Sequence, residues 1–389
     1  MSHPVSTRRA ALVGMTSALL VFCWQFLTVH YNYHGDWSGL FDTGEKMTVP
    51  PIVAAEHPYR FSAVGWDGQF YHAIAHDPFL QRGSARYIEA AGLRYRRILI
   101  PLMAYLVAGG NDALVDRTYH SIILLAFAVG AWWLSSLMQA AGKPAVAGLA
   151  FLVLPGSIAS LDRQAIDAGL LCFCCGFALY TRYTRNSRAL YLVLLGAGLV
   201  RDTGLLLTAA YCLWLVLRRE VRRAMIFATA AVPTIAWYLF VSRRTTPYGG
   251  GVVVWWPFSG VLHRLMHPMN YVGSGLKVEL IRGLDFLAAA GALVAMILTF
   301  RYIRRGRRDP VDMAIVLFAL LGIFVWRPGD WLEALDYGRI LSPLLFFEAL
   351  AWIEGATAFA LAPLCMMLPR FGVEMGAQVI GVIKGVLAV

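Results

Sequence analysis

Apolar runs of roughly span length recur along the whole chain and are separated by short polar loops. They occupy residues 11–29, 118–138, 144–160, 165–181, 188–200, 203–217, 224–242, 284–300, 311–326, 337–353 and 355–369. A helix needs roughly 20 apolar residues to cross about 30 Å of hydrocarbon, and no alternating strand pattern appears. The pattern predicts an all-α, polytopic transmembrane protein with ten or eleven spans, the run at 355–369 being the optional one.

Composition supports a single integral membrane domain covering residues 1–389. Hydrophobic residues make up 59% of the chain, charged residues only 15%, and the mean hydropathy is +0.60. Soluble domains carry about 25% charged residues. The six cysteines all lie inside apolar runs, which indicates buried packing rather than a disulfide framework.

The net charge of +11 indicates topology rather than nucleic-acid binding. On one face of the predicted bundle, loops around residues 8–9, 143, 182–188, 218–223 and 301–308 hold 15 lysines and arginines, whereas the short loops on the other face hold only four. Because positive loops stay in the cytoplasm, we expect a cytoplasmic N-terminus and two extracytoplasmic loops, at 30–117 and 243–283. Membrane lipids are expected partners, and nucleic acid is not. The absence of an Asn-x-Ser/Thr acceptor site and of a retention signal fits a bacterial plasma membrane.

The first loop is expected to carry two interfacial helices, around residues 66–76 and 97–108. The second of these helices contains the apolar run ILIPLMAYLVAG, which is about 12 residues or roughly 18 Å of helix. This run is too short to span the membrane. A crossing there would also invert every later loop.

Asp67, in the segment GWDGQFYHAIAHDPF, is the candidate catalytic residue. A carboxylate beside a bilayer is costly unless it has a function. Helical spacing places Tyr71 on the side of Asp67, and Gln69, His72 and His76 along another side. The alternative is that Asp67 is only the N-cap of its helix.

His72 and His76 stand one helical turn apart, and Asp77 follows them. This spacing suits a divalent metal, but histidine is also common on amphipathic interface helices. Apart from this possible metal, we expect no cofactor.

Arginines are the candidate phosphate ligands. Arg94, Arg96 and Arg97 fall within four positions, which suits a phosphate or diphosphate, or equally a belt on lipid headgroups. Three acid and arginine pairs recur at span ends: Asp162 with Arg163, Arg201 with Asp202, and Asp336 with Arg339. The first two are expected to be structural ion pairs, and Arg339 is the exception. Arg339 opens an apolar span, so we expect it to reach a cavity and meet an anion there.

The WD motif, followed by an aromatic and histidine-containing helix in a loop after the first span, resembles the PIG-V-like mannosyltransferases of the GT-C glycosyltransferase class. The segments FLVLPGSIASLDRQAIDAGLL, LVRDTGLLL and DYGRILSPLL are similar to further segments of that family. The resemblance implies a GT-C fold and an enzyme that moves a mannose-like hexose, with inversion, from a polyprenyl phosphate to an extracytoplasmic glycan or lipid acceptor.

The resemblance also implies an acidic base in the first outer loop, and Asp67 is the matching position. Asp36, just past the first span, is the rival base. Gln69 and His72 are candidate substrate-binding residues. The cations available for the departing phosphate are Arg94, Arg96, Arg97, Arg201 and Arg339. The competing function is a transporter or flippase of lipid-linked sugars, which would place ionisable groups at mid-bilayer.

Overall fold

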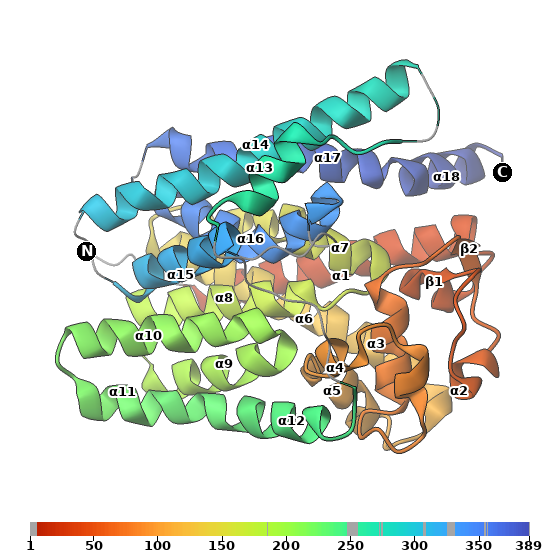
Figure 1. Ribbon diagram of the computed structural model, residues 1–389, viewed down its shortest axis with the longest axis horizontal. Helices are drawn as coiled ribbons and strands as arrows, with labels where there is room; N and C mark the ends of the chain where they lie inside the picture. The colour runs from red at the N-terminus through yellow and green to blue at the C-terminus, as the bar shows by residue number, and fades with distance from the viewer. Residues whose placement is uncertain are drawn as a thin grey trace.

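The computed structural model describes residues 6–184, 186–246, 256–271, 273, 275–305, 309–324, 331–353, 355 and 357–388. These residues are largely helical (Figure 1), which confirms the all-α class. The α-helices are α1 (Thr7–Asn32), α2 (Pro51–Ala54), α3 (Asp67–His76), α4 (Ala91–Arg94), α5 (Leu99–Val107), α6 (Asp112–Ala140), α7 (Pro155–Arg163), α8 (Asp167–Arg182), α9 (Ser187–Val200), α10 (Leu205–Leu217), α11 (Val221–Ala228), α12 (Val232–Ser242), α13 (Ser259–Met266), α14 (Leu276–Arg305), α15 (Pro310–Phe324), α16 (Ala334–Ile353), α17 (Ala362–Glu374) and α18 (Gly376–Leu387).

Shorter elements complete the fold. Strands β1 (Thr43–Gly44) and β2 (Arg60–Ser62) pair in parallel. The 3-10 helices are η1 (Trp37–Phe41), η2 (Ser84–Tyr87), η3 (Ala145–Val153), η4 (Asp202–Gly204), η5 (Thr229–Ala231) and η7 (Ala358–Leu361).

Several helices have the length and apolarity of membrane spans. Within the described part of the chain these are Thr7–Asn32, Asp112–Ala140, Val221–Ser242 and Leu276–Arg301, and two bent helix pairs would raise the number from 4 to 6. Large apolar side chains such as Leu12, Met15 and Leu19 lie exposed on α1, as expected of lipid-facing residues. The protein is therefore membrane-embedded. The figure of ten or eleven spans stays a prediction.

Two predicted spans differ in shape from a single straight helix. Residues 144–160 form η3 and α7, which meet at 66°. Pro155 begins α7, and because proline has no N–H and restricts the residue before it, the first helix ends there. The span predicted at 284–300 begins earlier, at Leu276. Charged residues Glu279 and Arg282, which pair at 2.7 Å, extend this helix beyond its apolar part.

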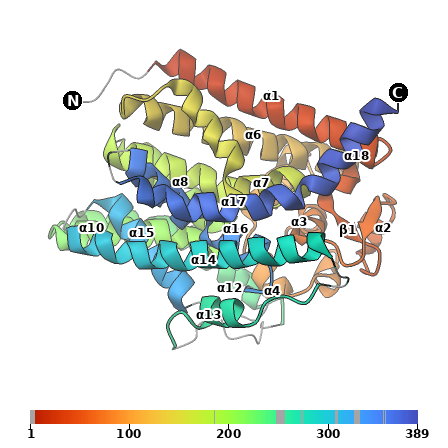
Figure 2. The ribbon, with the colours of Figure 1, turned by 90° about the horizontal axis from the view of Figure 1, so that it is seen from above.

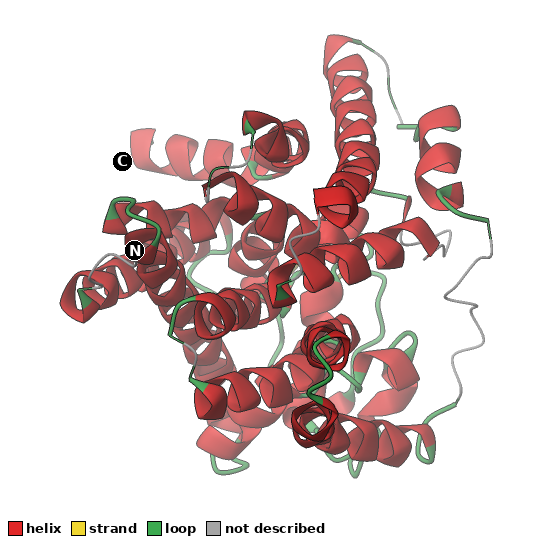
Figure 3. Ribbon diagram, turned by 90° about the vertical axis from the view of Figure 1, so that its left-hand side faces the viewer, coloured by secondary structure: helices red, strands yellow, loops and turns green. Residues whose placement is uncertain are grey.

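The core of the bundle is built around α6, which packs against α1, α5, α8 and η3. Figure 2 shows α1 and α6 running side by side, and Figure 3 shows the bundle from its left-hand end. Gly130 of α6 faces the ring of Phe151, so the aromatic side chain can pack directly on the helix backbone.

The first loop, residues 30–117, folds over one end of the bundle. Its elements, drawn in orange in Figure 1, lie opposite the end where α10 turns into α11. Both predicted short helices are confirmed, as α3 and α5. Helix α3 packs against α5, α6, η1 and α2. It is therefore held on several sides by elements of its own loop and by the bundle.

The second loop and the C-terminal tail contain further helices. Helix α13 lies in the loop predicted at 243–283, whereas its glycine run at 249–251 and Trp255 fall outside the described residues. In the tail, α18 meets the end of α1: Gln378 accepts a hydrogen bond from Asn32 at 2.7 Å and donates one to the Tyr33 hydroxyl at 2.6 Å.

Candidate functional site

The glycines of the WD segment allow its backbone to approach its neighbours closely. Gly65 has a φ of +69°, in the left-handed region that favours glycine. A Cβ atom on Gly68 would collide with the carbonyl oxygen of Arg163. Helix α3 begins at Asp67, after the N-cap residue Trp66. The alternative prediction that Asp67 is the N-cap is therefore wrong, and its carboxylate is directed to other partners.

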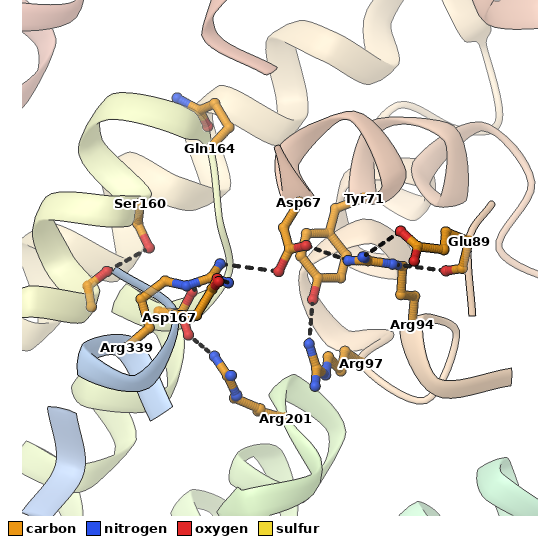
Figure 4. Close-up of polar contacts among 12 residues, drawn as sticks. Asp67, Tyr71, Glu89, Arg94, Arg97, Ser160, Gln164, Asp167, Arg201 and Arg339 are labelled. Atoms are coloured by element: carbon orange, nitrogen blue, oxygen red, sulfur yellow. Dashed lines mark hydrogen bonds and ion pairs between the residues drawn. The ribbon is translucent and has the colours of Figure 1, made fainter. Parts of the chain in front are cut away.

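Asp67 lies between two arginines that come from distant parts of the chain (Figure 4). Its Oδ1 pairs with Arg94 Nη1, and its Oδ2 lies 3.0 Å from Arg339 Nη1. The exposed fractions of the three side chains are 17% for Asp67, 14% for Arg94 and 7% for Arg339. The structure thus brings together the predicted base and two of its predicted cations.

The charge state of Asp67 follows from these neighbours. Burial by itself raises the pKa of the Asp67 carboxyl, because the charged form is costly to desolvate. The guanidinium groups of Arg94, Arg339 and Arg97 outweigh burial and hold this pKa well below its usual range. Asp67 is therefore a firmly ionised carboxylate while both arginines face it.

Asp167, at the start of α8, links two of the predicted arginines. Its carboxylate pairs with Arg201 and lies 3.6 Å from Arg339, as Figure 4 shows. The predicted pair of Arg201 with Asp202 is therefore wrong. Arg201 meets the carboxylate of Asp167 from α8, whereas Asp202 pairs with Arg97. The predicted pair Asp162 with Arg163, at 3.2 Å, is confirmed. Arg339, which was expected to meet an anion, also pairs with Asp336 at 3.1 Å.

Arg97 lies at the same end of the bundle and is held by two groups. Its Nη1 donates to the Tyr71 hydroxyl at 3.0 Å, and its Nε pairs with Asp202 at 3.2 Å. Tyr71 is one helical turn after Asp67 and lies on the same side of α3, as the helical spacing predicted, and both residues contact arginines. The contact of Tyr71 with Arg97 was not predicted.

Aromatic rings cover the two arginines of Asp67. The guanidinium of Arg94 lies 3.9 Å from the ring centroid of Phe70, and that of Arg339 lies 4.5 Å from that of Trp66. Arg163 also contacts Trp66, at 4.2 Å. Such cation–π contacts orient guanidinium groups without neutralising them. These two contacts give the aromatic ring of Trp66, the residue before Asp67, a structural role.

Three predicted site residues have other contacts. Asp36 caps η1 and accepts hydrogen bonds from the Ser38 backbone N–H at 2.9 Å and hydroxyl at 2.7 Å. Gln69 accepts from Gly44 N–H at 3.2 Å and donates to the Val64 carbonyl at 3.0 Å, so it ties β1 to the WD segment. Arg96 lies over the ring of Tyr238, at 5.2 Å.

His72 and His76 lie on the other side of α3, in a second polar cluster with Glu56 and Asp116. The ring nitrogen and carboxylate oxygen atoms of this cluster lie within 4.8 Å of one another. Burial lowers the pKa of His72, but Asp116 and Glu56 raise it to about 9. One interpretation of the cluster is therefore an imidazolium between two carboxylates.

Asp77, predicted as a neighbour of the histidines, is occupied elsewhere. Its carboxylate accepts backbone N–H groups of Gln81 at 2.7 Å, Arg82 at 3.0 Å and Ser84 at 3.1 Å. It stabilises the turn after α3. The carboxylates that meet the histidines come instead from beyond α2 and from α6, and no local spacing in the sequence connects either of them with α3.

Comparison of the chain with protein-family models, with curated proteins and with solved structures finds no match. The functional argument therefore rests on the sequence and on the geometry of these two clusters.

Proposed function

We propose that this chain is a membrane glycosyltransferase of GT-C type in a bacterial plasma membrane. In this proposal it moves a mannose-like hexose from a polyprenyl phosphate to a glycan or lipid acceptor, with inversion, on the extracytoplasmic side. The observation that carries the proposal is the pairing of Asp67 with Arg94 and Arg339 at the loop-covered end of an apolar helical bundle.

Two guanidinium groups that converge on one carboxylate also suit a phosphate. Both anions present oxygens at spacings that match the planar donors of arginine. Arg94 and Arg339 are held by Phe70 and Trp66 in addition to Asp67, so they keep a defined orientation when their anion changes. We infer that the donor phosphate replaces Asp67 at these two arginines.

This exchange would also prepare Asp67 to act as the base. With the arginines engaged by phosphate, burial becomes the dominant influence, and burial raises the pKa of Asp67. The acceptor oxygen then attacks the sugar C1 as the C1–O bond to phosphate breaks. The acceptor proton passes to Asp67, and polyprenyl phosphate leaves with the bonding electron pair. Arg94 and Arg339 stabilise its added charge.

The test is sugar transfer by the full chain in lipid nanodiscs, with polyprenyl-phosphate mannose as donor and short glycans or lipids as acceptors, detected by mass spectrometry. Loss of a general base typically costs about 10²–10⁴-fold in rate, so Asp67→Asn should lose transfer by that factor. The matched control is Asp36→Asn. Asparagine caps helices as well as aspartate does, so this variant should keep the wild-type rate.

Equal turnover by Asp67→Asn and wild type would exclude Asp67 as the base. If Asp36→Asn lost transfer while Asp67→Asn stayed active, Asp36 would be the base. Folding of each variant is checked by thermal unfolding in the same nanodiscs.

A second candidate, transport of lipid-linked sugars, is favoured by Glu348. This residue lies within α16 with none of its side chain exposed, and neither carboxyl oxygen has a hydrogen-bond partner among the described residues. An ionisable group inside a membrane helix often marks a transport path. Movement of a labelled lipid-linked sugar across a proteoliposome, abolished by Glu348→Gln and unaffected by Asp67→Asn, would establish transport instead.

A further inference from the structure

The cluster on the far side of α3 brings ring nitrogens and carboxylate oxygens to separations near those of a tetrahedral metal site, with Glu56 meeting the two histidines through its two oxygens. His72 Nε2 lies 2.8 Å from Asp116 Oδ1 and 3.3 Å from Glu56 Oε2. His76 Nε2 lies 3.4 Å from Asp116 Oδ1 and 3.5 Å from Glu56 Oε1. Zinc bonds of about 2.0–2.1 Å place neighbouring ligand atoms of a tetrahedron about 3.3–3.4 Å apart. Three of the four separations fall at or next to this value.

His72 has no hydrogen-bond partner for its ring nitrogens among the residues that the structure describes. Its side chain is 1% exposed, and within the described part of the chain its Nε2 meets Asp116 and Glu56 as close ion-pair contacts rather than as hydrogen bonds. The ring is held by stacking on Phe41, with centroids 4.1 Å apart and planes 4° from parallel. A buried imidazole nitrogen that faces two carboxylates outside hydrogen-bond geometry indicates a ligand placed between them.

His76 has the hydrogen bond that metal-bound histidines usually make. Its Nδ1 lies 3.2 Å from Asp112 Oδ1, and Arg82 holds the same carboxylate at 2.7 Å. A carboxylate that accepts the Nδ1 proton fixes the tautomer and leaves Nε2 free as the ligand atom. Nε2 is the nitrogen that faces Glu56 and Asp116.

We propose that Glu56, His72, His76 and Asp116 bind one divalent transition-metal ion of zinc type. Two neutral imidazoles and two carboxylates balance the two positive charges of the ion. With four protein ligands the site is closed, as in structural zinc sites. The ligands come from the segment after α2, from α3 and from α6, so the ion would fasten the helix that carries Asp67 to the bundle. This proposal does not depend on the proposed reaction.

The test is the metal content of the full chain, purified in nanodiscs through an affinity tag without histidine and measured by mass spectrometry of the elements. About one zinc ion per chain is expected, retained after dialysis, as for closed structural sites. The double variant His72→Ala/His76→Ala should fall below about a tenth of that value. The matched control is His57→Asn, an exposed histidine next to Glu56 with a φ of 51°, which asparagine tolerates.

A second variant covers the case in which the double alanine chain fails to fold. His76→Cys supplies another zinc ligand and should keep the metal. Wild-type chain that purifies without metal and takes up none of Zn²⁺, Co²⁺ or Mn²⁺ in dialysis would overturn the proposal. So would equal metal content in a folded double variant and in the control. Because the readout is metal content, loss of the glycosyltransferase hypothesis would leave this result standing.

Discussion

The two sides of α3 show opposite solutions to the burial of charge. On one side the carboxylate of Asp67 is surrounded by guanidinium groups from α4 and α16. On the other side, two imidazoles face carboxylates from the segment after α2 and from α6. The first arrangement is an anion held by cations that can exchange it for another anion. The second is a set of ligand atoms around a common centre.

This difference separates two tasks on one helix. The guanidinium side suits a ligand that enters and leaves, because each arginine keeps an aromatic contact when its anion changes. The imidazole side suits a permanent link, because its histidines are buried and oriented by Phe41 and Asp112. If this interpretation is correct, changes on one side should leave the function of the other side intact.

The largest effect is expected from Arg339→Gln. It removes a cation from Asp67, Asp167 and Asp336 at once, and breaking a buried ion pair from one partner costs about 3–5 kcal/mol of stability. Sugar transfer should also be lost. The control is Arg96→Gln, which among the described residues removes a cation–π contact to Tyr238, worth about 0.5–1 kcal/mol. Thermal unfolding and transfer measure both variants, and equal destabilisation by the two would contradict the central place of Arg339.

An intermediate effect is expected from Asp112→Asn on the imidazole side. Among the described residues, the ion pairs of the Asp112 carboxylate are with the Nδ1 of His76 and the guanidinium of Arg82. Loss of such an outer carboxylate typically weakens metal affinity about 10–100-fold. Competition of the purified chain with a chromophoric zinc chelator measures this change. Transfer at saturating zinc should stay at the wild-type rate, and a transfer defect there would show that the two sides are coupled.

The smallest effect is a shift in pH dependence on the guanidinium side. Asp67 must be ionised to accept a proton, so activity falls as the pH drops through its pKa. In the free enzyme the arginines hold that pKa below its usual range, so the acid limb of kcat/KM should lie below about pH 4. With the phosphate engaging the arginines, the pKa rises, and the acid limb of kcat should lie at a higher pH. Coinciding limbs would contradict the exchange of anions at the arginines.

Much of the fold could be predicted from the hydrophobic pattern, because the number of consecutive apolar residues indicates which segments are membrane helices. The short helix α5 was found from its apolar run in the same way, and α3 from the helical spacing of the WD segment. The break at Pro155 and the early start of α14 at Leu276 were missed. A window of hydropathy detects apolar length, whereas proline geometry and charged helical turns decide where a helix bends or begins.

For the candidate site, too, the sequence predicted local features well and contacts between helices poorly. The WD segment identified Asp67, and helical spacing placed Tyr71 beside it and the histidines apart from it. The partners of these residues were assigned less well. Arg201 was paired with its neighbour Asp202 but contacts Asp167, and Asp77 was placed near histidines that meet Asp116 and Glu56. Neighbours in the chain are poor guides to partners when the partners come from different helices.

The sequence by itself determined that this is an apolar, helical membrane protein and which side chains on α3 share a face, since both follow from local periodicity. Tertiary structure alone decided that Arg94 and Arg339, 245 positions apart by their numbers, meet on one carboxylate. It also decided that Glu56 and Asp116 join two histidines. Such contacts depend on how helices pack, and packing is set by the whole bundle rather than by any segment of it.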